Sequence, residues 1–143
     1  MRSHCKHQIA LPKLTGSFLS ITAICKYAFW VIFVILTYLF LVPQQYLIPE
    51  VFDWWDKLQH SLAFGVLTIL GLLAYARAGS GVFRVIILLS IYGALIEVLQ
   101  ILSGWRYGEF RDWLADLLGI AIAWGVFAYI QKHHYLSRLF KTT

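Results

Sequence analysis

Polar side chains interrupt three of the chain's long apolar stretches, each time near one end of the stretch. The clusters are Asp56 and Lys57 with His60, then Glu97 with Gln100, then Arg111 and Asp112 with Asp116. A charged side chain in the centre of a bilayer costs roughly 2.5–3.5 kcal/mol or more, so such residues are rare there and indicate function. Because the clusters fall at one membrane level, we expect them to form a polar pocket near one membrane surface.

Asp56 and His60 are four residues apart, so they share one face of a helix. A carboxylate one turn from an imidazole orients the ring and increases its basicity, as in a general base or a proton relay. The alternative is an interfacial aspartate that caps the helix, with His60 hydrogen-bonded to a neighbouring helix. The pair alone leaves both interpretations open.

Glu97 lies about six residues inside the expected end of its helix, or roughly 9 Å at 1.5 Å per residue. A lone ionised carboxylate is unfavourable at this depth. Glu97 should therefore be protonated, or paired with His60, Arg106 or Arg111. Gln100 lies on the same stripe of the helix. A structural ion pair and a catalytic or ligand-binding role both fit this placement.

Asp112 and Asp116 place two carboxylates four residues apart on the last apolar stretch. Asp116 falls about one turn inside the membrane and should face the same interior. Further along, Gly119 and Ala123 form a pair of small residues that suits close packing against another helix.

Two arginines, Arg106 and Arg111, flank the mouth of the expected pocket. They could bind a phosphate or carboxylate through a bidentate fork, or they could simply neutralise the acidic residues nearby. The candidate catalytic residues are His60, Glu97 and Asp116. The candidate ligand-binding residues are Asp56, Lys57, His60, Glu97, Gln100, Arg106, Arg111, Asp112 and Asp116.

Metal binding is not expected from the sequence. A single histidine at membrane level, without a cysteine beside it, disfavours zinc. Mg²⁺ or Ca²⁺ could bind the carboxylates, but the nearby arginines argue against it. We therefore expect neither a metal nor another cofactor.

The composition is that of an integral membrane protein. Hydrophobic residues make up 60% of the 143 residues and charged residues 13%, whereas a soluble domain has about 25% charged. The mean hydropathy is +0.71. Four apolar stretches are each long enough to cross a hydrocarbon core of roughly 30 Å. We predict an all-α membrane fold, a bundle of four transmembrane helices at about residues 24–42, 57–76, 83–102 and 112–130.

We predict three segments along the chain. They are a basic N-terminal arm at residues 1–17, a transmembrane domain at 18–130 and a basic tail at 131–143. Nine lysines and arginines lie near the termini and the loop 77–84, and three lie near the other two loops. The positive-inside rule then predicts that both termini are cytoplasmic and that the polar clusters face the exterior. The net charge of +5 comes largely from these flanks, so it indicates anionic lipid as a partner and not nucleic acid.

The order of these polar residues resembles that of the VanZ-like family. The resemblance rests on Asp56-Lys57-Leu58-Gln59-His60 with Phe64, on Tyr92-Gly93 with Glu97 and Gln100, and on Arg106, Asp112 and Asp116 followed by Gly119. It covers roughly residues 30–128. The resemblance implies a small multi-pass protein of the bacterial cytoplasmic membrane, and the family's namesake is associated with resistance to the glycopeptide teicoplanin.

Two functions fit these observations. The first is a cell-envelope protein whose exterior pocket binds a polar group, such as a lipid-linked cell-wall precursor or a glycopeptide. The second is an enzyme acting on a lipid or lipid-linked sugar headgroup at the outer leaflet, with His60 or Glu97 as base, Asp56 orienting His60, and Arg106 or Arg111 binding an anion. An ion pathway is disfavoured, because the cytoplasmic half of the helices has no matching polar layer.

The orientation gives a direct prediction. A membrane-impermeant thiol reagent applied from outside should label a cysteine placed at Gln45 or Gly108, but not one placed at Ser80. The reverse labelling pattern would refute the orientation and move the polar pocket to the cytoplasmic face.

Overall fold

The computed structural model describes residues 15–43, 46, 53–76 and 80–139. This part of the chain consists of α1 (Thr15–Leu41), α2 (Asp53–Tyr75), α3 (Ser80–Ser103) and α4 (Phe110–Leu139), and it contains no strand. Each helix has a segment long and apolar enough to cross a membrane. The prediction of an all-α, four-helix membrane protein is therefore confirmed.

Each helix begins before its predicted start, and α4 also ends well beyond its predicted end. α2 begins at Asp53, so Trp54 and Trp55 lie in its first turn. α4 continues to Leu139, and much of the predicted tail is therefore helical. The apolar run stops near residue 130, but no glycine or proline follows it to end the helix. The arm up to residue 14, with Cys5, the loop residues 77–79 and the last four residues lie outside the described residues.

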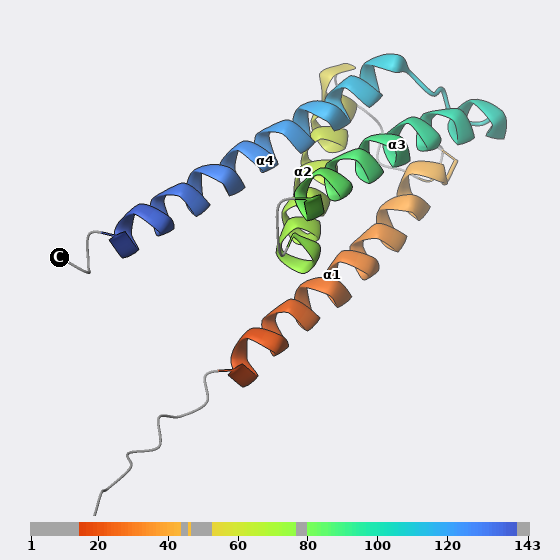
Figure 1. Ribbon diagram of the computed structural model, residues 1–143. Helices are drawn as coiled ribbons and strands as arrows, with labels where there is room; N and C mark the ends of the chain where they lie inside the picture. Colours follow the sequence, from red (N-terminus) through yellow and green to blue (C-terminus); the bar gives the residue numbers. More distant parts are fainter. Residues whose placement is uncertain (1–14, 44–45, 47–52, 77–79, 140–143) are drawn as a thin grey trace, which may run out of the picture.

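α2 and α3 lie between the two outer helices. α1 packs against both of them, and α4 packs against α3 and most extensively against α2 (Figure 1). In the described part of the chain α1 and α4 do not touch. The start of α1 and the end of α4 lie at one end of the bundle, and the turn between α3 and α4 lies at the other (Figure 1).

Aromatic rings fill the centre of the bundle. Phe64 is fully buried and contacts Tyr92, whose ring also packs on Phe33 with centroids 4.4 Å apart. The Tyr92 hydroxyl lies 2.7 Å from the hydroxyl of Thr37, and this hydrogen bond joins α1 to α3. Apolar side chains also cover the outside of the bundle, as expected for helices that face lipid.

Glycines set how closely α4 approaches its neighbours. A Cβ atom at Gly119 would collide with the backbone carbonyl of Ser61 on α2. A Cβ atom at Gly93 on α3 would lie 2.7 Å from Oδ2 of Asp116. The predicted small-residue edge of α4 is therefore a real contact, and it brings the polar residues of three helices together.

This contact can be tested with two glycines of the same helix. Gly119→Ala should lower the free energy of unfolding by about 1–3 kcal/mol, because the new methyl group overpacks a helix–helix contact. Gly125→Ala is the matched control, since a Cβ atom there meets nothing within 4 Å. The control should be neutral, or stabilising by up to about 1 kcal/mol, because alanine favours helix. Thermal unfolding in detergent measures both, and equal melting temperatures would contradict the close contact.

Candidate functional site

The predicted polar clusters meet inside the bundle, at the end where α3 turns into α4. Five of these side chains are buried, with relative exposures of 7% or less: His60, Glu97, Gln100, Asp112 and Asp116. Asp56 and Lys57 are half-buried beside them. The structure thus brings together seven of the nine residues predicted for the site.

His60 is held by Asp116. Its Nδ1 atom lies 2.9 Å from Oδ1 of Asp116, and both side chains are almost fully buried. Because a carboxylate oxygen accepts, Nδ1 is the donor and carries a proton. The ring also packs on Phe40, with centroids 4.4 Å apart. The sequence had assigned the orienting role to Asp56, but the structure gives it to Asp116, across the α2–α4 contact.

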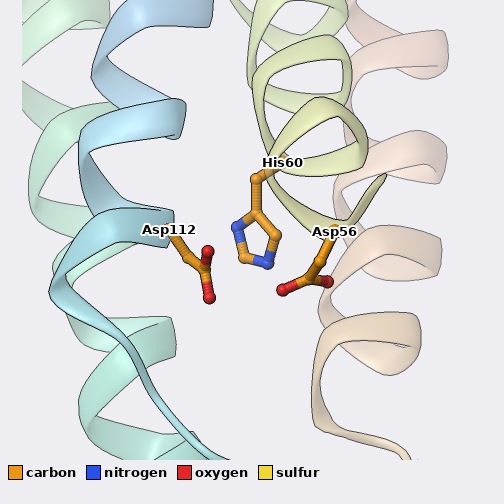
Figure 2. Close-up of side chains that lie close together, drawn as sticks. All are labelled: Asp56, His60 and Asp112. Atoms are coloured by element: carbon orange, nitrogen blue, oxygen red, sulfur yellow. The ribbon is translucent and has the colours of Figure 1, made fainter. Parts of the chain in front are cut away.

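The other ring nitrogen of His60 is free. Nε2 is buried and has no hydrogen-bonding partner among the described residues. Figure 2 shows the imidazole between the carboxyl groups of Asp56 and Asp112. One ligand atom from each of these three side chains lies within 4.8 Å of the other two.

Glu97 is joined to the turn that precedes α4. Its Oε2 atom accepts a hydrogen bond of 2.8 Å from the backbone N–H of Glu109, and its Oε1 atom lies 3.9 Å from Nδ1 of His60. Gly108 makes this approach possible, because a Cβ atom there would collide with the backbone carbonyl of Glu97. Of the partners predicted for Glu97, His60 is the one found beside it.

Lys57 supplies the positive charge at the mouth of the site. Its Nζ atom lies 3.1 Å from Oδ1 of Asp112 and 3.4 Å from Oε2 of Glu109. Glu109 is not among the residues predicted for the site. Its only sequence signal was an acidic side chain three residues before Asp112, at the start of α4.

Arg106 and Arg111 are not part of this cluster. In the part of the chain that the structure describes, neither forms an ion pair with a carboxylate. Arg111 is exposed, and Arg106 is half-buried with an Nη1 atom that has no hydrogen-bonding partner there. The cluster is consequently acidic, because it contains four carboxyl groups and only two basic side chains, those of Lys57 and His60. These four belong to Asp56, Glu97, Asp112 and Asp116.

Gln100 has a structural contact as well as a free atom. Its Nε2 atom donates a hydrogen bond of 2.9 Å to the carbonyl of Phe40, and Trp105 Nε1 donates one of 3.0 Å to the carbonyl of Leu41. Both satisfy carbonyls in the last turn of α1, which have no partner within their own helix. Oε1 of Gln100 remains buried without a partner among the described residues.

Several buried polar atoms of the site are left without hydrogen bonds in the described part of the chain. They are His60 Nε2, Glu97 Oε1, Gln100 Oε1, Asp112 Oδ1 and Asp116 Oδ2, of which Asp112 Oδ1 lies 3.1 Å from Lys57 Nζ as an ion pair. Native proteins pair most buried polar atoms, so unpaired atoms gathered in one place indicate a ligand, an ion or ordered water. A groove of about 270 Å³ reaches Glu97 from outside, between α3 and the start of α4, and Phe110 and Trp113 line it.

Comparison with known proteins adds no relative. No protein-family model, curated protein or solved structure matches the chain.

The His60–Asp116 hydrogen bond predicts a spectroscopic result. In protein labelled with ¹⁵N-histidine, the Nδ1 resonance of His60 should have the chemical shift of a protonated nitrogen. Asp116→Asn should weaken the hydrogen bond, because bonds to an ionised acceptor are roughly twice as strong as neutral ones. The Nδ1 proton should then exchange faster with water. An unprotonated Nδ1 in the unmodified protein would contradict the assignment.

Proposed function

We propose that the chain is a VanZ-like protein of the bacterial cytoplasmic membrane whose polar site binds the headgroup of a lipid-linked cell-wall precursor or the polar part of a glycopeptide. The observation that carries this proposal is the set of unpaired buried polar atoms on α2, α3 and α4. Holding such atoms without partners is costly, so they favour a bound polar molecule.

The position of the site supports a headgroup as its ligand. The acidic cluster lies at one end of the helices, where Asp56 and Lys57 are half-buried and Glu109 is exposed. A lipid headgroup occupies this level of the membrane, whereas its acyl chains lie deeper. With both termini cytoplasmic, as the distribution of basic residues favours, the site faces the outer leaflet.

The charges of the site favour the hydroxyl and ammonium groups of a ligand. Carboxylates are acceptors only, and each oxygen can take hydrogen bonds from such donors. Glu97 Oε1 and Asp116 Oδ2 are both buried and free to accept. Sugars and amines, which occur in cell-wall precursors and in glycopeptides, carry these donors. An anionic group would need an additional cation, because Arg106 and Arg111 lie outside the cluster.

The His60–Asp116 pair favours a second function, an enzyme that acts on a lipid or lipid-linked sugar at the same leaflet. Asp116 holds Nδ1, and the free Nε2 could take a proton from water or from a sugar hydroxyl. This arrangement is that of a general base with its orienting carboxylate. Turnover distinguishes the enzyme from a binding protein, which returns its ligand unchanged.

Glu97→Gln tests the proposal. The substitution keeps the size and the acceptor for the Glu109 N–H but removes the carboxylate charge. We expect the variant to fold and express with a modest loss of stability, and to lose most of the ligand that native mass spectrometry detects on the unmodified protein. Any teicoplanin resistance that the chain confers on cells should fall with it.

Glu109→Gln is the matched control for loss of an acidic group at this end. The Glu109 side chain is about half exposed, and its backbone contact to Glu97 is unaffected. The control should keep its ligand. A stable Glu97→Gln protein with full ligand occupancy and full phenotype would exclude Glu97 from binding and from catalysis. Loss of folded protein would identify Glu97 as structural.

A further inference from the structure

We propose that Asp56, His60 and Asp112 bind a divalent transition-metal ion, of the Zn²⁺ or Mn²⁺ type, with Asp116 positioning His60 from the opposite side of its ring. The further role of this ion, to hold the oxygen atoms of a headgroup, rests on the function proposed above. Binding of the ion itself does not depend on that proposed function.

The three side chains have the chemistry and the spacing of metal ligands. They offer two carboxylate oxygens and one imidazole nitrogen, all within 4.8 Å of one another. A tetrahedral ion with bonds of about 2.1 Å has ligand atoms roughly 3.4 Å apart, so the side chains need to close by at most about 1.4 Å. Figure 2 shows both carboxyl groups turned toward the imidazole.

An observation independent of this spacing points to a ligand at the same place. His60 is 1% exposed, and its Nε2 has no hydrogen-bonding partner among the described residues. Asp116 occupies Nδ1 at 2.9 Å. In metal sites the ring nitrogen that does not bind the ion commonly donates to a carboxylate, which fixes the tautomer and the orientation of the ring. Here that carboxylate is already in position.

A second group of possible ligands, His60, Glu97 and Asp116, lies deeper. It is the weaker site for two reasons. Nδ1 of His60 already donates to Asp116, and Oε2 of Glu97 already accepts from the Glu109 N–H. By contrast Asp56 is half-buried, so an ion reaches the outer group from the membrane surface.

The charges around the outer group suit a divalent cation. The sequence argued against a metal because of the arginines nearby, but neither Arg106 nor Arg111 pairs with a carboxylate in the described residues. Lys57 is the cation in contact with Asp112, at 3.1 Å, and Glu109 lies within its reach at 3.4 Å. An arriving ion therefore shares Asp112 with Lys57 or displaces Lys57 toward Glu109.

Three protein ligands leave at least one coordination position open. In zinc sites with this number of ligands a water molecule or a substrate takes the open position. The ion would then bind a phosphate or hydroxyl oxygen of a headgroup, which accounts for how an acidic site could hold an anionic molecule.

The test uses full-length protein purified in detergent, stripped with chelator and returned to Zn²⁺ or Mn²⁺. Bound metal is measured by elemental mass spectrometry, and affinity by competition with a chromogenic indicator. We expect one ion per chain and a higher melting temperature when the ion is present. Asp56→Asn should weaken binding by about tenfold or more, and Asp116→Asn by about 10–100-fold. Asp56 forms no ion pair in the described residues, so Asp56→Asn should fold normally.

Glu97→Gln and Glu109→Gln serve as matched controls, and both should keep the ion. Loss of the ion in Glu97→Gln, with retention in Asp56→Asn, would overturn the assignment in favour of the deeper group. Less than one ion per chain in the unmodified protein, or equal affinity in all variants, would overturn it altogether. Headgroup binding that persists in chelator would refute the bridging role and leave the proposed function intact. An ion bound without any headgroup would support the metal site and count against the proposed function.

Discussion

With no side chain at residue 119, α4 rests directly on the backbone of α2 at Ser61. The polar site depends on this contact. His60 directly precedes Ser61 on α2, and Asp116 lies three residues before Gly119 on α4, so the short separation lets Asp116 reach His60 at 2.9 Å. The same turn of α4 fits against Gly93 of α3, where a larger residue would meet the Asp116 carboxyl group. Close packing through small residues, a general means of joining helices in lipid, here also places the titratable groups.

The bilayer limits what these groups can do. A polar atom at this depth finds no water on the lipid side, so it must be paired within the protein or used by a ligand. The protein has paired some of them: Gln100 and Trp105 satisfy carbonyls of α1, and the Glu109 N–H satisfies one oxygen of Glu97. The atoms left over belong to side chains of α2, α3 and α4. This division separates the structural polar groups from those available to bind.

The sequence could predict the helices, because runs of about 20 apolar residues have few alternatives. It could also predict that the polar residues converge, because they occur at one level of three helices. It could not predict which carboxylate holds His60. Asp56 is nearer in the sequence, but the pairing depends on how α4 is rotated against α2, and the Ser61–Gly119 contact sets that rotation. The sequence also could not show that Arg106 and Arg111 lie outside the cluster, because charge alone does not determine whether a side chain near a loop points inward.

The dependence of His60 on a residue of the last helix has a consequence for how the protein is made. The ribosome delivers α2 and α3 to the membrane before α4, so for a time His60 and Glu97 lie in the bilayer without Asp116 or the Glu109 N–H. Such an intermediate carries the cost of polar groups in lipid until α4 arrives. Docking of α4 relieves that cost and completes the polar cluster. A chain that ends before α4 would therefore expose its polar groups to lipid. These exposed groups would let the quality-control proteases of the membrane distinguish the truncated chain from the complete protein.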